Sequence, residues 1–185
     1  MGNSMIKIEP VMDADIVPGI QAAGIKLGIS FDYFKKSTEH IYKPTKEECD
    51  VLSTHNLWFF FHRDEMTIGG IHINEIYCYW DNNIVLEFSG DESILTGIHV
   101  MSKYSGYLLK KLKIGDRLDL LKYELGFDFY YGHGDTHYLK PNPLESEDIL
   151  EGVYVTTNYL LPYSAEYPDH IVTAITVYLY IHRNH

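Results

Sequence analysis

Hydrophobic and polar residues alternate with a period of two over much of the chain, which is the pattern of half-buried β-strands. Aromatic and β-branched runs predict strands at residues 57–62, 68–79 and 84–88, with another near 97–101. Between two of these runs, Asp81-Asn82-Asn83 predicts a hairpin turn.

The C-terminal part of the chain has two further runs of this kind. Residues 153–160 and 171–181 are rich in β-branched and aromatic residues, and we expect them to pair antiparallel. Before them, residues 132–143 contain two glycines and two prolines within a polar stretch. We expect that stretch to be a long loop that projects from the fold.

One short motif occurs twice. Residues 25–35, IKLGISFDYFK, align with residues 112–122, LKIGDRLDLLK, and the two glycines are 87 positions apart. Each copy predicts a short strand, a glycine turn at Gly28 or Gly115, and a short helix.

The residues after each glycine indicate where the helices begin. Ser30 and Asp116 are expected to cap them, and the helices should start near Ser30 and Arg117. We therefore predict an α+β fold of two similar halves, each with a glycine turn, a short helix and antiparallel strands. The first half is residues 1–102 and the second is residues 103–185, packed into one compact unit because no Pro- or Ser-rich linker separates them.

Composition limits the class of protein. The chain has 185 residues, 45% of them hydrophobic and 22% charged, enough for a sizeable core. Its N-terminus has no signal-peptide pattern, and no apolar run is long enough to cross a membrane. Two cysteines, Cys49 and Cys78, are too few for a disulfide framework. We expect a cytoplasmic protein with reduced thiols and no membrane partner.

Charge is unevenly distributed along the chain. Fifteen Lys and Arg residues against 26 Asp and Glu residues give a formal net charge of −11, which argues against direct nucleic-acid binding. Residues 64–102 contain seven acidic side chains and no basic one, and residues 141–182 contain six acidic side chains and no basic one. Such stretches are common as soluble surface, but they also favour a cationic partner.

Tyrosines accompany the carboxylates in both base-free stretches, a composition typical of protein-binding hot spots. We expect a partner-binding face with exposed carboxylates that contact a basic protein, the second stretch being the stronger choice. The residues assigned to this face are Asp81, Asp91, Glu92, Glu145, Glu147, Asp148, Tyr159, Tyr163, Glu166, Tyr167 and Asp169.

Catalytic constellations are weak in this sequence. The best is His133-Gly134-Asp135-Thr136-His137, but the glycines disfavour a helix there and no further ligand is evident. We expect no metal at His133, Asp135 and His137. Acidic neighbours of Cys49 disfavour its thiolate, and no hydrolase, zinc-protease or phosphate-loop motif occurs. We therefore expect no catalytic residue, no cofactor and no enzymatic activity.

A small acidic α+β chain with repeated IKLG and LKIG turns, tyrosine-rich strands and no active site resembles a known class. These are the immunity proteins of bacterial polymorphic and contact-dependent-inhibition toxin systems. The resemblance implies that the chain binds a cognate toxin domain, commonly a basic nuclease, and neutralises it by stoichiometric blocking. It implies no catalysis.

Two other functions remain open at this level. A small-molecule or carbohydrate-binding module would use aromatic strand surfaces as stacking platforms. A histidine-dependent metal enzyme would use residues 133–137. Salt-dependent association with a basic protein favours the immunity function over the small-molecule module, whereas retained zinc favours the enzyme.

Overall fold

The computed structural model describes residues 8–38, 41–44, 57–68, 71–132, 134–141, 144 and 148–180. It is a mixed α/β structure with much more strand (42%) than helix (9%), compatible with the predicted α+β class. Within the described part of the chain, no helix has the length and apolar composition of a membrane-spanning segment.

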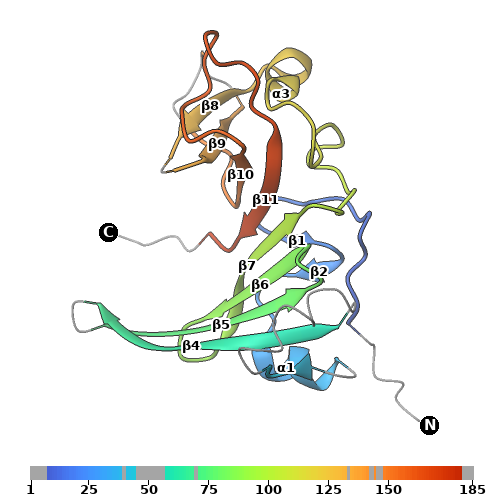
Figure 1. The fold of residues 1–185 in the computed structure, drawn as a ribbon, viewed down its shortest axis with the longest axis vertical. Helices are drawn as coiled ribbons and strands as arrows, with labels where there is room; N and C mark the ends of the chain where they lie inside the picture. The colour runs from blue at the N-terminus through green and yellow to red at the C-terminus, as the bar shows by residue number, and fades with distance from the viewer. Residues whose placement is uncertain are drawn as a thin grey trace.

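Nine strands form one continuous sheet in the order β3-β4-β5-β6-β7-β11-β10-β9-β8 (Figure 1). Neighbouring strands are antiparallel except β3 and β4, which are parallel. The strands before the middle of the chain are β3 (Ile41–Tyr42), β4 (Trp58–Ile68), β5 (Ile71–Trp80), β6 (Ile84–Ser89) and β7 (Ile94–Met101). Those after it are β8 (Asp128–Tyr131), β9 (Thr136–Lys140), β10 (Val153–Thr157) and β11 (Val172–Tyr178). A separate hairpin consists of β1 (Gln21–Ala22) and β2 (Ile25–Lys26).

In the described part of the chain, two short helices pack on the sheet. Helix α1 (Phe31–Lys36) begins directly after Ser30, whose hydroxyl accepts a hydrogen bond from the Tyr33 amide as predicted. Helix α3 (Asp119–Leu125) begins two residues later than expected and has no side-chain cap. The predicted cap Asp116 instead accepts a hydrogen bond from the Lys113 amide, so it stabilises the turn before the helix.

The strands predicted from alternation are present, and the hairpin at Asp81-Asn82-Asn83 is confirmed. Asp81 and Asn82 have φ of 47° and 52°, the left-handed conformation of a turn that favours right-twisted strands, and the Asn83 amide donates to the Trp80 carbonyl at 2.9 Å. The predicted projecting loop at residues 132–143 is wrong in its centre, because residues 136–140 form β9 inside the sheet. Two side chains of that strand, His137 and Leu139, point to the core and are fully buried.

The two copies of the repeated motif make the same backbone contacts. Gly28 and Gly115 have φ of +84° and +89°, a conformation that favours glycine. The amides of these glycines donate to the carbonyls of Leu95 and Val172, each at 2.9 Å. Three residues after each glycine, the Phe31 and Leu118 amides donate to the Ser93 and His170 carbonyls, which lie two positions before Leu95 and Val172.

The two strands that receive these contacts are also alike. β7 contains ILTGIHV and β11 with its preceding residue reads IVTAITV. Both have a bulge at threonine, where the Thr96 and Thr173 hydroxyls donate across the strand pair to the Glu87 and Thr156 carbonyls, each at 3.2 Å. These two strands pair with each other in antiparallel register and so join the two parts of the sheet.

One hydrophobic core runs through both parts of the sheet. In the first part, Phe34 lies edge-on to Trp58 at a ring-centroid distance of 5.1 Å, and both are buried. In the second part, Leu121 of α3 occupies the corresponding helix position and is also fully buried. The helix side of the sheet is therefore packed throughout, and functional surfaces must lie on loops, on helix exteriors or on the other side of the sheet.

Candidate functional site

The predicted carboxylates differ in exposure and pairing. Asp91, Glu92, Asp148, Glu166 and Asp169 are exposed, as expected, whereas Glu145 and Glu147 lie outside the described residues. The expectation of exposure is wrong for Asp81. Its side chain is only 12% exposed, because it accepts a hydrogen bond from the Asn83 amide group (3.1 Å) inside the hairpin turn and pairs with Lys103.

The exposed carboxylates do not form one face. Asp91 and Glu92 precede β7, whereas Glu166 and Asp169 precede β11. Because β7 and β11 are antiparallel, these two groups lie at opposite ends of the strand pair (Figure 1). Glu166 and Asp169 are therefore separated from Asp91 and Glu92 by the length of these strands, and we consider the two groups separately.

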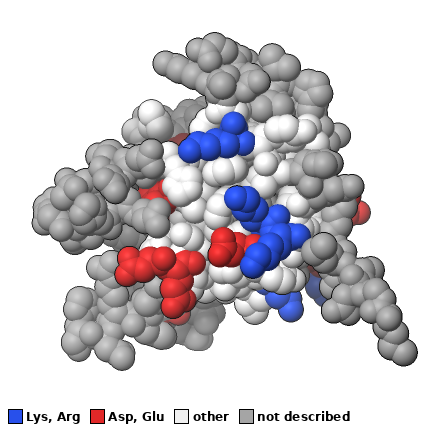
Figure 2. Space-filling view, turned by 90° about the horizontal axis from the view of Figure 1, so that it is seen from below, with Lys and Arg blue, Asp and Glu red and all other residues white. Residues whose placement is uncertain are grey.

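Figure 2 looks at the molecule from the side of α1 and shows basic and acidic side chains on the same face, with an acidic group directly beside the basic groups at its centre. Helix α1 itself ends with Lys35 and Lys36. This side has no uniform acidic surface, although the chain as a whole is acidic. It is a poor choice for a face that steers a cationic partner.

The connection between β10 and β11, residues 158–171, is the largest difference between the two parts of the sheet, and we call it the β10–β11 loop. The corresponding connection between β6 and β7 is only residues 90–93. The β10–β11 loop exposes four large side chains, with exposed fractions of 71% for Leu160, 45% for Leu161, 37% for Tyr159 and 44% for Tyr167. The same sheet connection is made without such residues in the first part, so the fold does not require them.

The base of this loop is held by specific hydrogen bonds. Asn158 donates its amide to the Ile171 carbonyl at 3.1 Å, and its side-chain oxygen accepts from the Ile171 amide at 2.7 Å. The Tyr131 hydroxyl donates to the Leu160 carbonyl at 2.8 Å. These contacts fix the backbone under the exposed leucines, which limits the entropy that the loop would lose on binding a partner.

Three predicted side chains of this loop have different roles. Tyr159 and Tyr167 are exposed, as expected for contact residues. Tyr163 packs edge-on against Phe129 at 5.0 Å and is a support for the loop, so its assignment as an exposed contact was wrong. Asp169 forms an ion pair with Arg117 at 2.9 Å, which leaves Glu166 as the loop carboxylate without an ion-pair partner among the described residues.

Two histidines lie beneath the loop. His137 of β9 and His170 at the end of the loop are both 0% exposed, and their ring centroids are 5.0 Å apart. Burial lowers the pKa of both imidazoles, and for His137 the neighbouring His170 lowers the pKa further. The neutral forms are therefore favoured in the folded protein.

A second polar group lies on the side of the sheet away from the helices. His99 of β7 places Nε2 3.5 Å from the Glu87 carboxylate and Nδ1 2.9 Å from the Thr176 hydroxyl, which in turn is hydrogen-bonded to Tyr154. A side chain at Gly97 would come within 3.2 Å of the Glu87 carboxylate, so glycine makes room for this network. No sequence pattern singled out Glu87 or His99, because a lone histidine in a strand carries no motif.

Tyrosines continue this surface across the second part of the sheet. Tyr130, Tyr138, Tyr154 and Tyr178 form a ladder with ring-centroid distances of 6.4, 5.8 and 5.8 Å between successive members. Such a ladder offers ring faces and hydroxyl groups on one side of four neighbouring strands. The sequence pattern indicates aromatic strand surfaces in general but places Tyr138 in a projecting loop, so it did not predict this ladder.

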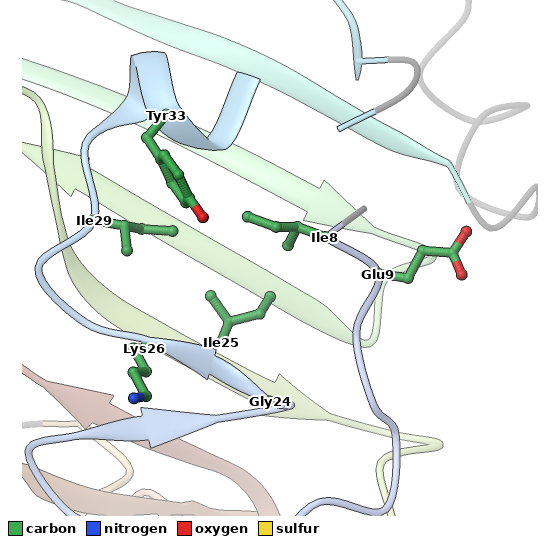
Figure 3. Close-up of a pocket in the computed structure, with 7 residues that line it drawn as sticks. All are labelled: Ile8, Glu9, Gly24, Ile25, Lys26, Ile29 and Tyr33. Atoms are coloured by element: carbon green, nitrogen blue, oxygen red, sulfur yellow. The ribbon is translucent and has the colours of Figure 1, made fainter. Parts of the chain in front are cut away.

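A small pocket lies between the N-terminal segment, β2 and α1 (Figure 3). Ile8, Ile25 and Ile29 point into it, whereas Glu9 points away. Its volume of about 250 Å³ lies below the usual range for sites that enclose a metabolite-sized ligand. The residues around it hold the N-terminal segment against β2 and α1, and we place no functional site in this pocket.

Nucleophile and metal chemistry have little support among the described residues. Cys78 is buried, and burial raises the pKa of its thiol, which disfavours a reactive thiolate. Of the proposed cluster, Asp135 contributes its backbone carbonyl to the His137 Nδ1 hydrogen bond, while His133 lies outside the described residues. In the described ranges, no three His, Cys, Asp or Glu side chains gather in a way that could hold a metal ion.

The exposed leucines of the β10–β11 loop and the buried histidine pair were missed by sequence reasoning. Leu160 and Leu161 follow a strand directly, so the pattern reads them as the end of that strand. His137 and His170 are 33 positions apart, and only the pairing of β9 with β10 and of β10 with β11 brings them together.

No protein-family model, curated protein or solved structure matches this chain.

Proposed function

We propose that this chain is a non-catalytic, cytoplasmic binding protein that neutralises a protein partner by stoichiometric blocking, as an immunity protein neutralises a toxin domain. The observation that supports this proposal is the β10–β11 loop, which exposes Leu160, Leu161 and two tyrosines on a backbone fixed by hydrogen bonds. Exposed leucines that the fold does not require are typical of a contact surface.

The composition of the loop indicates what kind of surface the partner has. Aromatic and aliphatic anchors at the centre of a patch, with polar residues around them, are typical of protein interfaces. Here Leu160 and Leu161 supply exposed apolar groups, and Glu166 supplies a charge that has no ion-pair partner in the described part of the chain. We infer a partner with an apolar depression surrounded by Lys or Arg, so the contribution of charge is mainly to association rate.

The test uses the C-terminal domain of a large secreted protein encoded next to this chain, purified and mixed with it at equal concentration. We expect a one-to-one complex and loss of the toxic activity of that domain. The substitution Glu166→Lys should slow association about threefold or more at low ionic strength, and the difference should vanish at about 1 M salt.

The control is Glu92→Lys, which reverses an exposed carboxylate at the opposite end of the β7–β11 pair. Equal slowing by both substitutions would mean that net charge matters and the loop does not. Absence of such a neighbouring domain, or no complex with it, would contradict the immunity proposal.

A second candidate function rests on the other side of the sheet. The tyrosine ladder, together with the Glu87–His99–Thr176 network, supports a small-molecule or carbohydrate-binding module. Such a module should be stabilised against heat by a soluble ligand in the absence of any protein partner, an outcome that the immunity proposal does not predict.

We further propose that the two parts of the chain are duplicated units. The support is the shared glycine turn, the shared backbone hydrogen bonds to β7 and β11, and the shared threonine bulge. In the β7–β11 register, Ile98 is opposite Val177, while Val100 is opposite Ile175. In the aligned segments ILTGIHV and IVTAITV, Ile98 is equivalent to Ile175 and Val100 to Val177. The two cross-strand pairs are therefore related by exchange of the units, as a two-fold axis between them requires.

Alanine substitution at the two turn glycines provides a matched test of this proposal. A methyl group would meet no heavy atom within 4 Å at either Gly28 or Gly115, so only the left-handed backbone conformation opposes the change. We expect each substitution to lower the free energy of unfolding by about 1–2 kcal/mol. Urea denaturation should give equal losses, whereas a large difference would indicate unrelated turns.

A further inference from the structure

The buried histidine pair has no counterpart in the first unit. By the correspondence of the sheet registers, Cys78 and Ser93 occupy the positions of His137 and His170. Two imidazoles therefore lie in the core of the second unit only, directly beneath the loop that distinguishes it. Their presence requires an explanation other than the shared fold.

The hydrogen bonding of the pair is incomplete. His137 directs Nδ1 to the Asp135 carbonyl at 3.2 Å, and His170 directs Nδ1 to the Thr157 hydroxyl at 3.0 Å. The Nε2 atom of each ring is buried without a hydrogen bond of normal geometry in the part of the chain that the structure describes. Buried polar atoms are rarely left in this state, so each group needs a reason.

The loop rests on these rings. Tyr159 lies 5.0 Å and Tyr163 lies 5.8 Å from the His170 ring, measured between ring centroids. From the opposite side, Tyr131 of β8 lies 5.5 Å from His137. The walls of the site are therefore aromatic rings that carry no charge at neutral pH.

Charged groups around the pair are already engaged or act weakly. Asp169, next to His170 in the chain, is paired with Arg117, which also forms a 2.6 Å ion pair with Asp119 beyond Tyr163. The Asp135 carboxylate and the Asp135 and Leu161 carbonyls favour the charged form of His137, but they do not reverse the downward shift of its pKa. Among the residues that the structure describes, neither ring forms an ion pair with a carboxylate, and only the Asp135 carboxylate favours the protonated form of His137.

We propose that His137 and His170 form a pH-sensitive latch, in which protonation of either ring in mild acid releases the β10–β11 loop from the sheet. An imidazolium in this site would be desolvated and would face a second imidazole at 5.0 Å, so opening the loop to water relieves the charge. For partner binding, this inference rests on the proposed function of the loop, because release would disorder the exposed leucines.

The sign of the pH effect follows from the direction of the shifts. Both pKa values are lowered below the ordinary value of 6.5, so the open state binds protons more readily than the closed state. The closed loop is fully favoured above pH 6.5 and becomes less favoured as the pH falls through and below it. Each proton that only the open state takes up increases the equilibrium constant of loop opening by up to about tenfold for each unit by which the pH falls. Two protons therefore allow an increase of up to about 100-fold for each unit.

Hydrogen exchange of the purified chain tests the latch without any partner. Between about pH 7.5 and about pH 5.5, after correction for intrinsic exchange, loop amides at 159–167 should gain at least about tenfold in opening. Amides of Ile98 and Val100 in the central strand should not change. In the double variant His137→Gln/His170→Gln, the pH dependence of the loop should disappear, and NMR titration should assign low pKa values to these two rings in the wild type.

The matched control is His62→Gln, because His62 is exposed on β4 and its loss should leave the pH dependence of the loop intact. If the double variant does not fold, each single variant should still halve the slope of the loop opening against pH. Loop opening that is independent of pH, or that survives in the glutamine variants, overturns the latch. A failed partner assay with a pH-dependent loop contradicts only the proposed function.

Discussion

Replacement of Gly152 by alanine is expected to lower the free energy of unfolding by about 3 kcal/mol or more. Gly152 directly precedes β10 and has φ of +76°, and an added Cβ would lie 2.4 Å from both the Cα and the amide nitrogen of Gly19. Its carbonyl also accepts hydrogen bonds from the amides of Gly19 (2.9 Å) and Tyr178 (3.0 Å). The methyl group would therefore separate the N-terminal segment from β10 and β11.

Gly90→Ala is the matched control for this prediction. Gly90 has φ of +79°, almost the same as Gly152, but an added Cβ there meets nothing within 4 Å. It should cost only the backbone strain of about 1–2 kcal/mol. Urea denaturation of both variants separates the clash from the strain, and equal losses would show that the Gly19 segment does not pack on Gly152 in solution.

Replacement of Leu160 by serine is expected to weaken the complex with the protein partner by at least about 30-fold, with no change in the fold. Leu160 is 71% exposed and stands beside Leu161 at the centre of the loop surface, where truncation of an anchor typically costs about 2 kcal/mol or more. The Leu160 backbone carbonyl keeps its hydrogen bond from Tyr131 in the variant, so the loop should stay in place.

Tyr33→Ser controls for the loss of an exposed apolar side chain. Tyr33 is 52% exposed on α1, at the opposite end of the molecule from the β10–β11 loop (Figure 1). Its loss should leave partner affinity within about twofold, while the dissociation rate of the Leu160 variant rises. Unchanged affinity of a folded Leu160→Ser variant would remove the loop from the interface.

The comparison of the two units explains why these sites were difficult to predict. Under the proposed duplication, the glycine turns, helices and central strands belong to both units, and the β10–β11 loop and its histidines are what differs between them. The two acidic stretches contain conspicuous charge in the sequence, yet Asp81 and Asp169 are held by Lys103 and Arg117. A carboxylate that pairs within its own chain contributes little to the attraction of a partner.

Local sequence determined the secondary structure wherever a short-range rule applies. Ser30 caps α1, Asp81 and Asn82 make the hairpin turn, and the runs predicted as strands correspond to β5, β6, β7 and β11. The strand β9 was read as loop because glycines and prolines flank it, and its two core side chains are recognised only when a neighbouring strand buries them.

Only the tertiary structure decided which residues form the sites. The antiparallel pairing of β7 with β11 separates Glu92 from Glu166, although both belong to acidic stretches. The same sheet brings His137 and His170 into contact and places Glu87 beside His99. These outcomes depend on strand order and register, which arise from contacts between residues far apart in the chain, whereas composition and periodicity describe each segment alone.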